Sequence, residues 1–390
     1  MLSQAGCQSR RTRLWQALPG SVEWLLITDS RHVHYFANFW IPPYNFSDKE
    51  RAWLLLKRDG HSSLLVDNFS FKSTSVGSPF VDEVVNQSWY DHRHGVRNRD
   101  HILIDALQEA IGGLDLSRGL LEAEATPFMA AELLTGVKSH VECDIGGAPQ
   151  RVDMTLGTLI RRLRRQKERD ELDLLNQCMR ATEAGHRRAR EIIAPGIGEF
   201  EIFSAVYQSV LAAAQRPVLI YGDFRANSPE TPKQGGLPTN HILRDGELFI
   251  LDYSVVMDGY RSDFTNTYAV GEPTNAQREL FALCAEGLLT GEQALRAGMT
   301  AREAWQAASR PLQEGGYPQG IPHHAGHGIG LGHPEDPILV CENDDILLEN
   351  DVVTLEPGQY VVGIGGVRVE HNFRITATGC ERLSHHEIRL

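Results

Sequence analysis

Residues 247–270 read ELFILDYSVVMDGYRSDFTNTYAV, in which two β-rich stretches flank the dipeptide Asp258-Gly259. Asp-Gly between two such stretches is a strong signal for a β-hairpin. If this dipeptide forms a two-residue loop, Ser254 lies opposite Asp263 on the neighbouring strand. Asp252 then shares the same sheet face, because side chains two positions apart on a strand point the same way. The two aspartates would be diagonal neighbours.

Two other registers of this hairpin are open. A loop at Met257-Asp258 would place Asp252 directly opposite Asp263, whereas a three-residue loop would separate them. Two carboxylates on one sheet face repel each other unless a cation or a proton lies between them. An ordinary solvent-facing hairpin would be favoured if this stretch stood alone, so the rest of the chain decides.

A histidine-rich stretch follows at residues 323–337, which read HHAGHGIGLGHPEDP. Neutral imidazole is the commonest metal ligand near neutral pH, and the four histidines here are His323, His324, His327 and His333. Glycines at every second position around His327 let the backbone come close to a ligand. A flexible loop with incidental metal affinity is the alternative. The regular glycine spacing favours a shaped site.

Two further strand-like stretches each contain a single glutamate. Glu356 interrupts VVTLEPGQYVV at 352–362, and Glu370 interrupts GGVRVEHNFRI at 365–375. A carboxylate among apolar neighbours is costly to bury unless it is paired or bound to a metal. Either glutamate alone would be assigned an outward-facing position, but together with the hairpin and the histidines they indicate a site.

The combined set is four carboxylates and one imidazole: Asp252, Asp263, His327, Glu356 and Glu370. Oxygen donors with one nitrogen suit Mn²⁺, Co²⁺, Fe²⁺ or Zn²⁺ better than a soft metal. Two ions about 3.5–4 Å apart can share bridging carboxylates and activate one water between them. The pattern therefore predicts a dinuclear metallohydrolase.

The chain of 390 residues is long enough for two domains of about 150 residues or more each. Strand-like stretches at 22–27, 52–56 and 63–66 alternate with helical ones such as 101–112, which predicts a smaller α/β domain over residues 1–155. Residues 156–390 are expected to form an α+β domain. Its strands dominate 247–270 and 351–377, and its helices are expected at 198–214, 276–297 and 300–314. The charged segment 157–193 has two out-of-phase apolar stripes, which indicates a helix with a break.

Charge and composition exclude several classes of protein. The net charge of −13 argues against a nucleic-acid partner, because phosphates would be repelled. The six scattered cysteines form no CxxC pair and indicate a reducing compartment. A secretory signal and a run of about 18 apolar residues are both missing, so a cytoplasmic protein without a membrane span is expected. The sequence contains no GxSxG nucleophile motif.

The order and spacing of four motifs carry a family resemblance. The motifs are D-x10-D at 252–263, GHGIGL at 326–331, TLEPG at 354–358 and GVRVE at 366–370. In these the chain resembles the creatinase/prolidase/methionine aminopeptidase superfamily, the pita-bread metallopeptidases of family M24. His34-Tyr35-Phe36-Ala37-Asn38-Phe39 is similar to the amino-terminal domain of prolidases and aminopeptidases P. The resemblance implies a pita-bread catalytic domain over 156–390, preceded by a creatinase/prolidase-like domain over 1–155.

The resemblance also implies an activity and a role for each site residue. The expected reaction is hydrolysis of Xaa-Pro peptide bonds, of aminopeptidase P or dipeptidase type, by a hydroxide that bridges two divalent ions. Mn²⁺ is expected first, with Co²⁺, Zn²⁺ or Fe²⁺ as alternatives. Asp252, Asp263, His327, Glu356 and Glu370 would bind the ions, and Glu356 would also shuttle protons. His323 and His333 would stabilise the tetrahedral intermediate or position the substrate, and Arg368 would brace the glutamates.

A homodimer is a further expectation, because the amino-terminal domain of this superfamily often closes the pocket of a partner subunit. Phe39, Trp40 and Tyr44 stand where such a contact would come. Simple packing of these aromatic side chains beside the Pro42-Pro43 turn is favoured over that contact. The expected ligand is a peptide or another small molecule.

Three positions depart from the family pattern. Gly235 stands where these peptidases usually carry a histidine, Asn266 stands where an arginine is usual, and His333 follows His327 by six residues instead of seven. These departures affect the substrate's surroundings more than the metal ligands. They leave two alternatives open: a metal-dependent hydrolase or lyase for a small non-peptide substrate, and a non-catalytic binding module on the same fold.

Overall fold

The computed structural model describes residues 1–42, 52–74, 77–94, 98–144 and 151–390. The chain divides into two compact units, Met1–Arg164 and Arg165–Leu390. The sequence placed this boundary after residue 155, which is too early. Helix α6 (Leu156–Leu163) packs against α1 (Gln4–Ala17) and against the hairpin of β6 (His140–Cys143) and β7 (Val152–Thr155), so it belongs to the first unit. Tyr44 lies outside the described residues.

The first unit is built on a five-stranded mixed sheet of order β4-β3-β2-β1-β5. Its strands are β1 (Trp24–Ile27), β2 (Ala52–Lys57), β3 (Ser62–Asp67), β4 (Glu83–Gln87) and β5 (Gly119–Leu121). In addition to α1 and α6, this unit contains the helices α2 (Ser30–Ala37), α3 (Asn68–Ser73), α4 (Arg99–Ala110) and α5 (Phe128–Ala131). A 3₁₀ turn forms at Leu116–Arg118. The strands predicted at 22–27, 52–56 and 63–66 and the helix predicted at 101–112 are confirmed, each within two residues at its ends.

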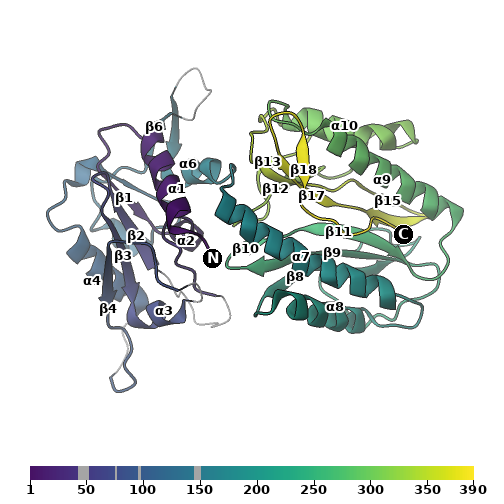
Figure 1. Cartoon of the computed structure of the whole chain (residues 1–390), viewed down its shortest axis with the longest axis horizontal. Coiled ribbons are helices and arrows are strands. Elements are labelled where there is room, and N and C mark those ends of the chain that lie inside the picture. The colour runs from purple at the N-terminus through teal and green to yellow at the C-terminus, as the bar shows by residue number, and fades with distance from the viewer. Residues whose placement is uncertain (43–51, 75–76, 95–97, 145–150) are drawn as a thin grey trace. The chain divides into compact units, whose positions relative to one another are not determined.

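The second unit encloses two sheets between two pairs of helices (Figure 1). The helices are α7 (Arg169–Ile192), α8 (Glu199–Ala214), α9 (Asn275–Ala294) and α10 (Ala301–Glu314). One sheet holds β8 (Leu219–Asn227), β9 (Leu248–Met257), β10 (Tyr260–Arg261) and β11 (Phe264–Ala269). The other has the order β13-β12-β14-β17-β18, with β12 (His327–Gly328), β13 (Glu335–Ile338), β14 (Val352–Leu355), β17 (His371–Ile375) and β18 (Cys380–Arg382). Strands β15 (Gly358–Val361) and β16 (Gly365–Arg368) form a separate hairpin.

Each pair of helices covers its own apolar core. Helices α7 and α8 bury side chains such as Cys178 and Val206 against Phe249 and Leu251 of β9. Helices α9 and α10 pack against the second sheet, where buried residues such as Leu355 and Phe373 contribute to a separate cluster. The predicted break in segment 157–193 is confirmed, because α6 ends at Leu163 and α7 begins at Arg169.

The central hairpin has the register that the Asp258-Gly259 loop predicts. Tyr260 pairs with Met257, and Thr265 pairs with Asp252. Asp258 and Gly259 have φ values of 47° and 81°, the left-handed conformation that a type I′ turn requires at both positions. The alternatives, a loop at Met257-Asp258 or a three-residue loop, are wrong.

The described part of the chain contains no helix that is both long enough and apolar enough to cross a membrane.

Candidate metal centre

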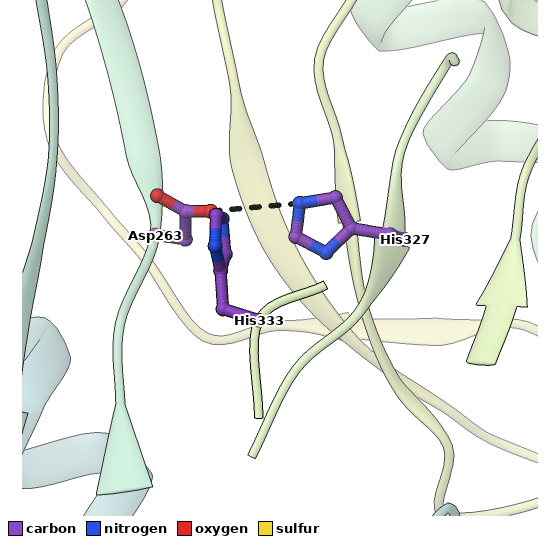
Figure 2. Close-up of side chains that lie close together, drawn as sticks. All are labelled: Asp263, His327 and His333. Carbon is purple, nitrogen blue, oxygen red and sulfur yellow. Dashed lines mark ion pairs between the residues drawn. The ribbon is translucent and has the colours of Figure 1, made fainter. Parts of the chain in front are cut away.

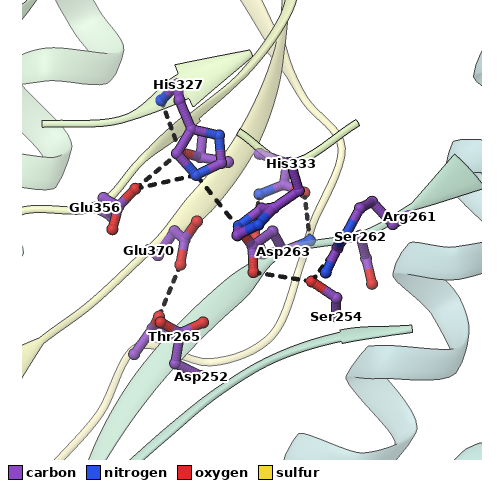
Figure 3. A network of polar contacts seen from close by, with 12 residues as sticks. Asp252, Ser254, Arg261, Ser262, Asp263, Thr265, His327, His333, Glu356 and Glu370 are labelled. Carbon is purple, nitrogen blue, oxygen red and sulfur yellow. Dashed lines mark hydrogen bonds and ion pairs between the residues drawn. The ribbon is translucent and has the colours of Figure 1, made fainter. Parts of the chain in front are cut away.

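The hairpin of β9 and β11 and the link between β16 and β17 bring three carboxylates together. Asp252 lies on β9, Asp263 precedes β11, and Glu370 lies between β16 and β17. One carboxylate oxygen of each residue lies within 4.8 Å of the others. The Glu370 amide donates to the Thr265 carbonyl at 3.0 Å, and the Thr265 hydroxyl donates to Glu370 Oε2 at 2.7 Å (Figure 3). Strand β11 therefore fixes both the backbone and the carboxylate of Glu370.

The second group of potential ligands gathers around His327. Its Nε2 atom lies 3.5 Å from Asp263 Oδ2 (Figure 2) and 3.5 Å from Glu356 Oε1. The Nδ1 atom lies 3.0 Å from the Gly328 carbonyl, which accepts only from a protonated nitrogen. In the neutral ring this bond leaves the lone pair on Nε2, which points toward the carboxylates.

Two more histidines reach the same carboxylates. His324 Nε2 lies 3.1 Å from Glu356 Oε1, and His333 Nε2 lies 2.5 Å from Asp263 Oδ2. His324, His327 and Glu356 form one group of ligand atoms within 4.8 Å, and Asp263, His327 and His333 form another. The structure thus places all five predicted ligands in one cluster and adds His324, to which the sequence assigned no separate role.

The electrostatics of this cluster show how strongly the carboxylates are crowded. Burial raises the pKa of Asp252 to about 7, and the charge of Asp263 adds to this while Arg368 opposes it. Burial and the charges of Asp263 and Glu356 raise the pKa of Glu370 well above its ordinary value. Like charges this close cannot all ionise without a compensating cation.

Histidines offset the crowding at the other two carboxylates. Burial alone would raise the pKa of Asp263, but the hydrogen bond and charge of His333 outweigh it and lower that pKa. Burial is outweighed at Glu356 too, where the hydrogen bond from His324 and the charge of His327 lower the pKa to about 2. The same contact with Glu356 raises the pKa of His324.

His323 lies beside the cluster in a different state. Burial lowers its pKa to about 4, so the ring is neutral at neutral pH. Its Nδ1 lies 2.7 Å from the His324 carbonyl and must carry the proton, which leaves Nε2 as an acceptor. This Nε2 atom is buried and has no hydrogen-bond partner among the described residues.

Arg368 does not brace the glutamates as the sequence predicted. Its Nη2 group pairs with Asp252 and donates to Asp223 Oδ2 at 2.8 Å, and its Nη1 donates to the Tyr360 hydroxyl at 2.7 Å. The reason is the register of β8 against β9, which sets Asp223 directly opposite Asp252. The guanidinium consequently serves two aspartates on β8 and β9.

The three departures from the family pattern have separate structural explanations. His333 reaches Asp263 despite its earlier position in the chain. Asn266 is fully buried and exchanges two hydrogen bonds with the backbone of Arg389, at 2.9 and 3.2 Å, so it ties the carboxyl-terminal segment to β11. At Gly235, an added Cβ would lie 3.1 Å from both carboxylate oxygens of Asp223.

A further group that could hold a metal, Asp29, His32 and Glu122, lies in the first unit. Both ring nitrogens of His32 are already engaged there. Nδ1 contacts Glu122, and Nε2 lies 3.0 Å from Arg164 Nη1. This group is a buried hydrogen-bond network around the start of α2.

Comparison with known proteins agrees with the geometry of the second unit. The model of metallopeptidase family M24 matches residues 173–377, more than half of the chain. The chain belongs to metallopeptidase family M24. An uncharacterized peptidase of Staphylococcus aureus (strain USA300) is 26% identical over 368 residues, which cover 93% of this chain and 94% of the relative.

Solved structures of similar fold extend over both units. The X-Pro aminopeptidase of Thermotoga maritima MSB8 matches with a TM-score of 0.76 and 20% identity, over 97% of this chain and 98% of that one. The Xaa-Pro dipeptidase of Bacillus anthracis matches with a TM-score of 0.74 and 23% identity, over 98% and 99%. The prolidase of Pyrococcus horikoshii OT3 gives a TM-score of 0.74 and 21% identity, over 99% of each chain. The predicted fold class, a pita-bread unit preceded by a smaller α/β unit, is confirmed.

Proposed function

We propose that this M24 peptidase cleaves Xaa-Pro peptide bonds and holds two divalent ions between Asp252, Asp263, His327, Glu356 and Glu370. The observation that supports the proposal is the position of Asp263. Its carboxylate belongs both to the group with Asp252 and Glu370 and to the group with His327. A carboxylate shared by two ligand groups is the arrangement that a pair of ions needs.

The charge and donor atoms of these residues suit such ions. Glu370 Oε1 is buried and has no hydrogen-bond partner among the described residues, which is costly unless a cation satisfies it. The raised pKa values of Asp252 and Glu370 indicate the same deficit of positive charge. Oxygen donors and imidazole suit Mn²⁺, which we propose as the resident metal, and also suit Co²⁺, Zn²⁺ or Fe²⁺. When bound, such a pair supplies a Lewis acid and an activated water nucleophile at neutral pH.

The side chains around the ions divide the proton transfers between them. The carboxylate of Glu356 is ionised at neutral pH and can accept a proton from the attacking water. It then delivers this proton to the leaving prolyl nitrogen. His324 Nε2, 3.1 Å from Glu356 Oε1, holds the carboxylate in position and can share its proton.

His323 and His333 are proposed to act on the substrate in different ways. The unprotonated Nε2 of His323 can accept an N–H of the substrate, so this residue positions the peptide and does not stabilise an oxyanion. His333 has a raised pKa because its hydrogen bond to Asp263 outweighs its burial. It can therefore donate to negative charge that develops on the scissile carbonyl oxygen.

A panel of peptides tests the proposal. The purified protein is loaded with Mn²⁺, its metal content is measured by elemental analysis, and it is given Xaa-Pro dipeptides, longer Xaa-Pro peptides and matched Xaa-Ala peptides. Two ions per chain and cleavage restricted to the proline peptides are expected. Stoichiometric metal with every Xaa-Pro peptide left intact would overturn the proposal.

One observation favours a second candidate, a hydrolase or lyase for a small non-peptide substrate. The side chain of Asp223 adds a carboxylate beside the metal ligands, next to the position where Gly235 replaces the usual histidine. Turnover of small amides in the same assay, without cleavage of peptides, would favour this candidate. A protein that bound no metal would instead indicate a binding module.

A further inference from the structure

Asp223 lies at the metal centre without belonging to any motif of the sequence. It is on β8, directly opposite the metal-binding Asp252 of β9. Only glycine fits at the preceding position, since a Cβ on Gly222 would lie 2.1 Å from the Asp252 carbonyl oxygen. The register of β8 against β9 places a fifth carboxylate beside the four that would bind the ions.

The partners of Asp223 leave part of its carboxylate open. Oδ2 accepts from Arg368 at 2.8 Å, and Oδ1 accepts from the Gly236 amide at 2.6 Å. A carboxylate has about four acceptor positions, so these two bonds do not saturate it. The Asp223 side chain is 27% exposed, whereas that of Arg368 is 12% exposed. In this ion pair the carboxylate of Asp223 is therefore more accessible to solvent than the guanidinium of Arg368.

Both terminal nitrogens of Arg368 are already engaged, and its Nε, which has no hydrogen-bond partner among the described residues, is buried. Its Nη2 group pairs with both Asp223 and Asp252, and its Nη1 donates to Tyr360. A substrate carboxylate at this position would meet Asp223 and a guanidinium that is already neutralised. The local charge instead favours a cation.

Gly235 and Asp223 are sterically linked. Because a Cβ at position 235 would lie 3.1 Å from both oxygens of Asp223, any side chain there would force this carboxylate to shift by a few tenths of an ångström. The Gly236 amide and carbonyl hold this loop against β8 through Asp223 and the Phe224 amide. The glycine that replaces the usual histidine therefore leaves room for the carboxylate of Asp223.

We infer that Asp223 determines substrate specificity by binding a positively charged group beside the scissile bond, such as the free amino terminus of a peptide. This inference rests on the proposed function for the nature of the scissile bond. Asp223 is not one of the five proposed metal ligands, and the substrate group that it binds would carry a positive charge.

A purely structural role is the competing explanation, since Asp223 also fixes the loop at Gly236. Asp223→Asn separates the two, because asparagine keeps an acceptor oxygen and the size of the side chain but loses the charge. Glu272→Gln makes the same charge change at a side chain that is 86% exposed, and it serves as the control. If Asp223→Asn does not fold, Gly235→Ala tests the same point by crowding the carboxylate.

Kinetics on a pair of peptides gives the first readout. An Xaa-Pro peptide with a free amino terminus is compared with its N-acetylated form, using the Mn²⁺-loaded wild type and both variants. Asp223→Asn is expected to lower kcat/KM for the free peptide by about tenfold, mostly by raising KM. A change of this size corresponds to the loss of one charge-assisted hydrogen bond. The acetylated peptide should change less than twofold. An equal loss for both peptides, or no loss, overturns the inference.

Calorimetry gives a second readout that does not depend on turnover. L-Alaninamide and its N-acetyl derivative are titrated into the same Mn²⁺-loaded proteins. A tenfold weaker binding of alaninamide alone in Asp223→Asn supports the inference even if no peptide is cleaved, in which case only the proposed function fails. Cleavage of Xaa-Pro peptides combined with unchanged alaninamide affinity overturns the inference and keeps the proposed function.

Discussion

The Nε2 atom of His333 lies 2.5 Å from Oδ2 of Asp263, the same carboxylate oxygen that faces His327 at 3.5 Å. One oxygen therefore meets two imidazoles, of which His327 is buried and His333 is about one-third exposed. The difference in exposure suits different roles. The buried ring suits the proposed role of a metal ligand, and the more exposed ring can meet the substrate.

We expect His333→Ala to lower kcat by about 100-fold, because the variant loses a donor to the charge that develops on the scissile carbonyl. Its affinity for Mn²⁺ should fall less than tenfold. Steady-state kinetics and metal titration by calorimetry measure the two effects. His327→Ala is the matched comparison and should lose most of its metal affinity. A His333→Ala variant that lost metal as completely as His327→Ala would make His333 a ligand.

The pKa of Asp252 predicts how the metal-free protein responds to pH. Burial raises this pKa from 3.8 to about 7. A carboxyl group with a raised folded-state pKa contributes stability that is complete below its unfolded pKa and is lost as pH rises through the folded value. The metal-free wild type should lose this contribution to its stability between about pH 4 and pH 7. The Asp252→Asn variant should not, because asparagine does not titrate.

Urea unfolding at a series of pH values checks this prediction. The free energy of unfolding of Asp252→Asn, measured relative to that of wild type, should increase by about 3 kcal/mol from pH 4 to pH 7. Asp245→Asn, at an exposed position, is the control and should show a constant difference. With saturating Mn²⁺ the order reverses, because only the wild type keeps its complete ligand set. A constant difference for Asp252→Asn would contradict the raised pKa.

The sequence predicted that these carboxylates and histidines lie together because the decisive geometry of the hairpin is local. Two left-handed residues, Asp258 and Gly259, fix the loop, and the loop fixes which side chains of β9 and β11 share a face. The positions of Glu356 and Glu370 were predicted for a similar reason, because they too depend on local strand structure. Each of their apolar stretches proved to be two strands that break at the glutamate, and this break turns Glu356 and Glu370 toward the cluster.

The residues that the sequence missed or misassigned depend on pairing between distant segments. Asp223 carries no motif, and its position follows only from the register of β8 against β9. The partners of Arg368 depend on the same register, so the expectation that it braces the glutamates was wrong. The unit boundary was placed too early because the apolar stripe of α6 shows burial without showing which unit it packs against.

Three buried histidines that pack against one another predict sensitivity to acid. The rings of His186, His371 and His386 lie within 4.7 Å of a neighbour in this group, and burial lowers the pKa of all three, that of His386 to about 3. A histidine with a lowered folded-state pKa contributes stability above its unfolded pKa that is lost as pH falls. Stability should therefore decline from about pH 6.5 downward.

His386→Phe tests this contribution, since phenylalanine can keep the stacking on Phe264 at 4.4 Å. The variant should be about 1 kcal/mol less stable than wild type at pH 7.5, because the hydrogen bond to the Thr265 carbonyl is lost. This deficit should shrink or reverse at pH 5. Thermal unfolding at both values measures it, and a deficit that widened in acid would count against the prediction.

Two hydrogen bonds join the side chain of Asn266 to the backbone of Arg389. We therefore expect a substitution at Asn266 to lower stability without affecting catalysis. Asn266→Ala should lower the free energy of unfolding by about 2 kcal/mol, because both hydrogen bonds between its buried side chain and the Arg389 backbone are lost, although Arg190 still donates to that carbonyl. The carboxyl-terminal segment should then become more open to limited proteolysis, while kcat/KM at a temperature well below Tm stays within twofold of wild type. Asn275→Ala, at an exposed position of α9, is the control for the loss of an asparagine. A large fall in kcat/KM with unchanged unfolding would instead place Asn266 in the substrate's surroundings, where the arginine of the family pattern would stand.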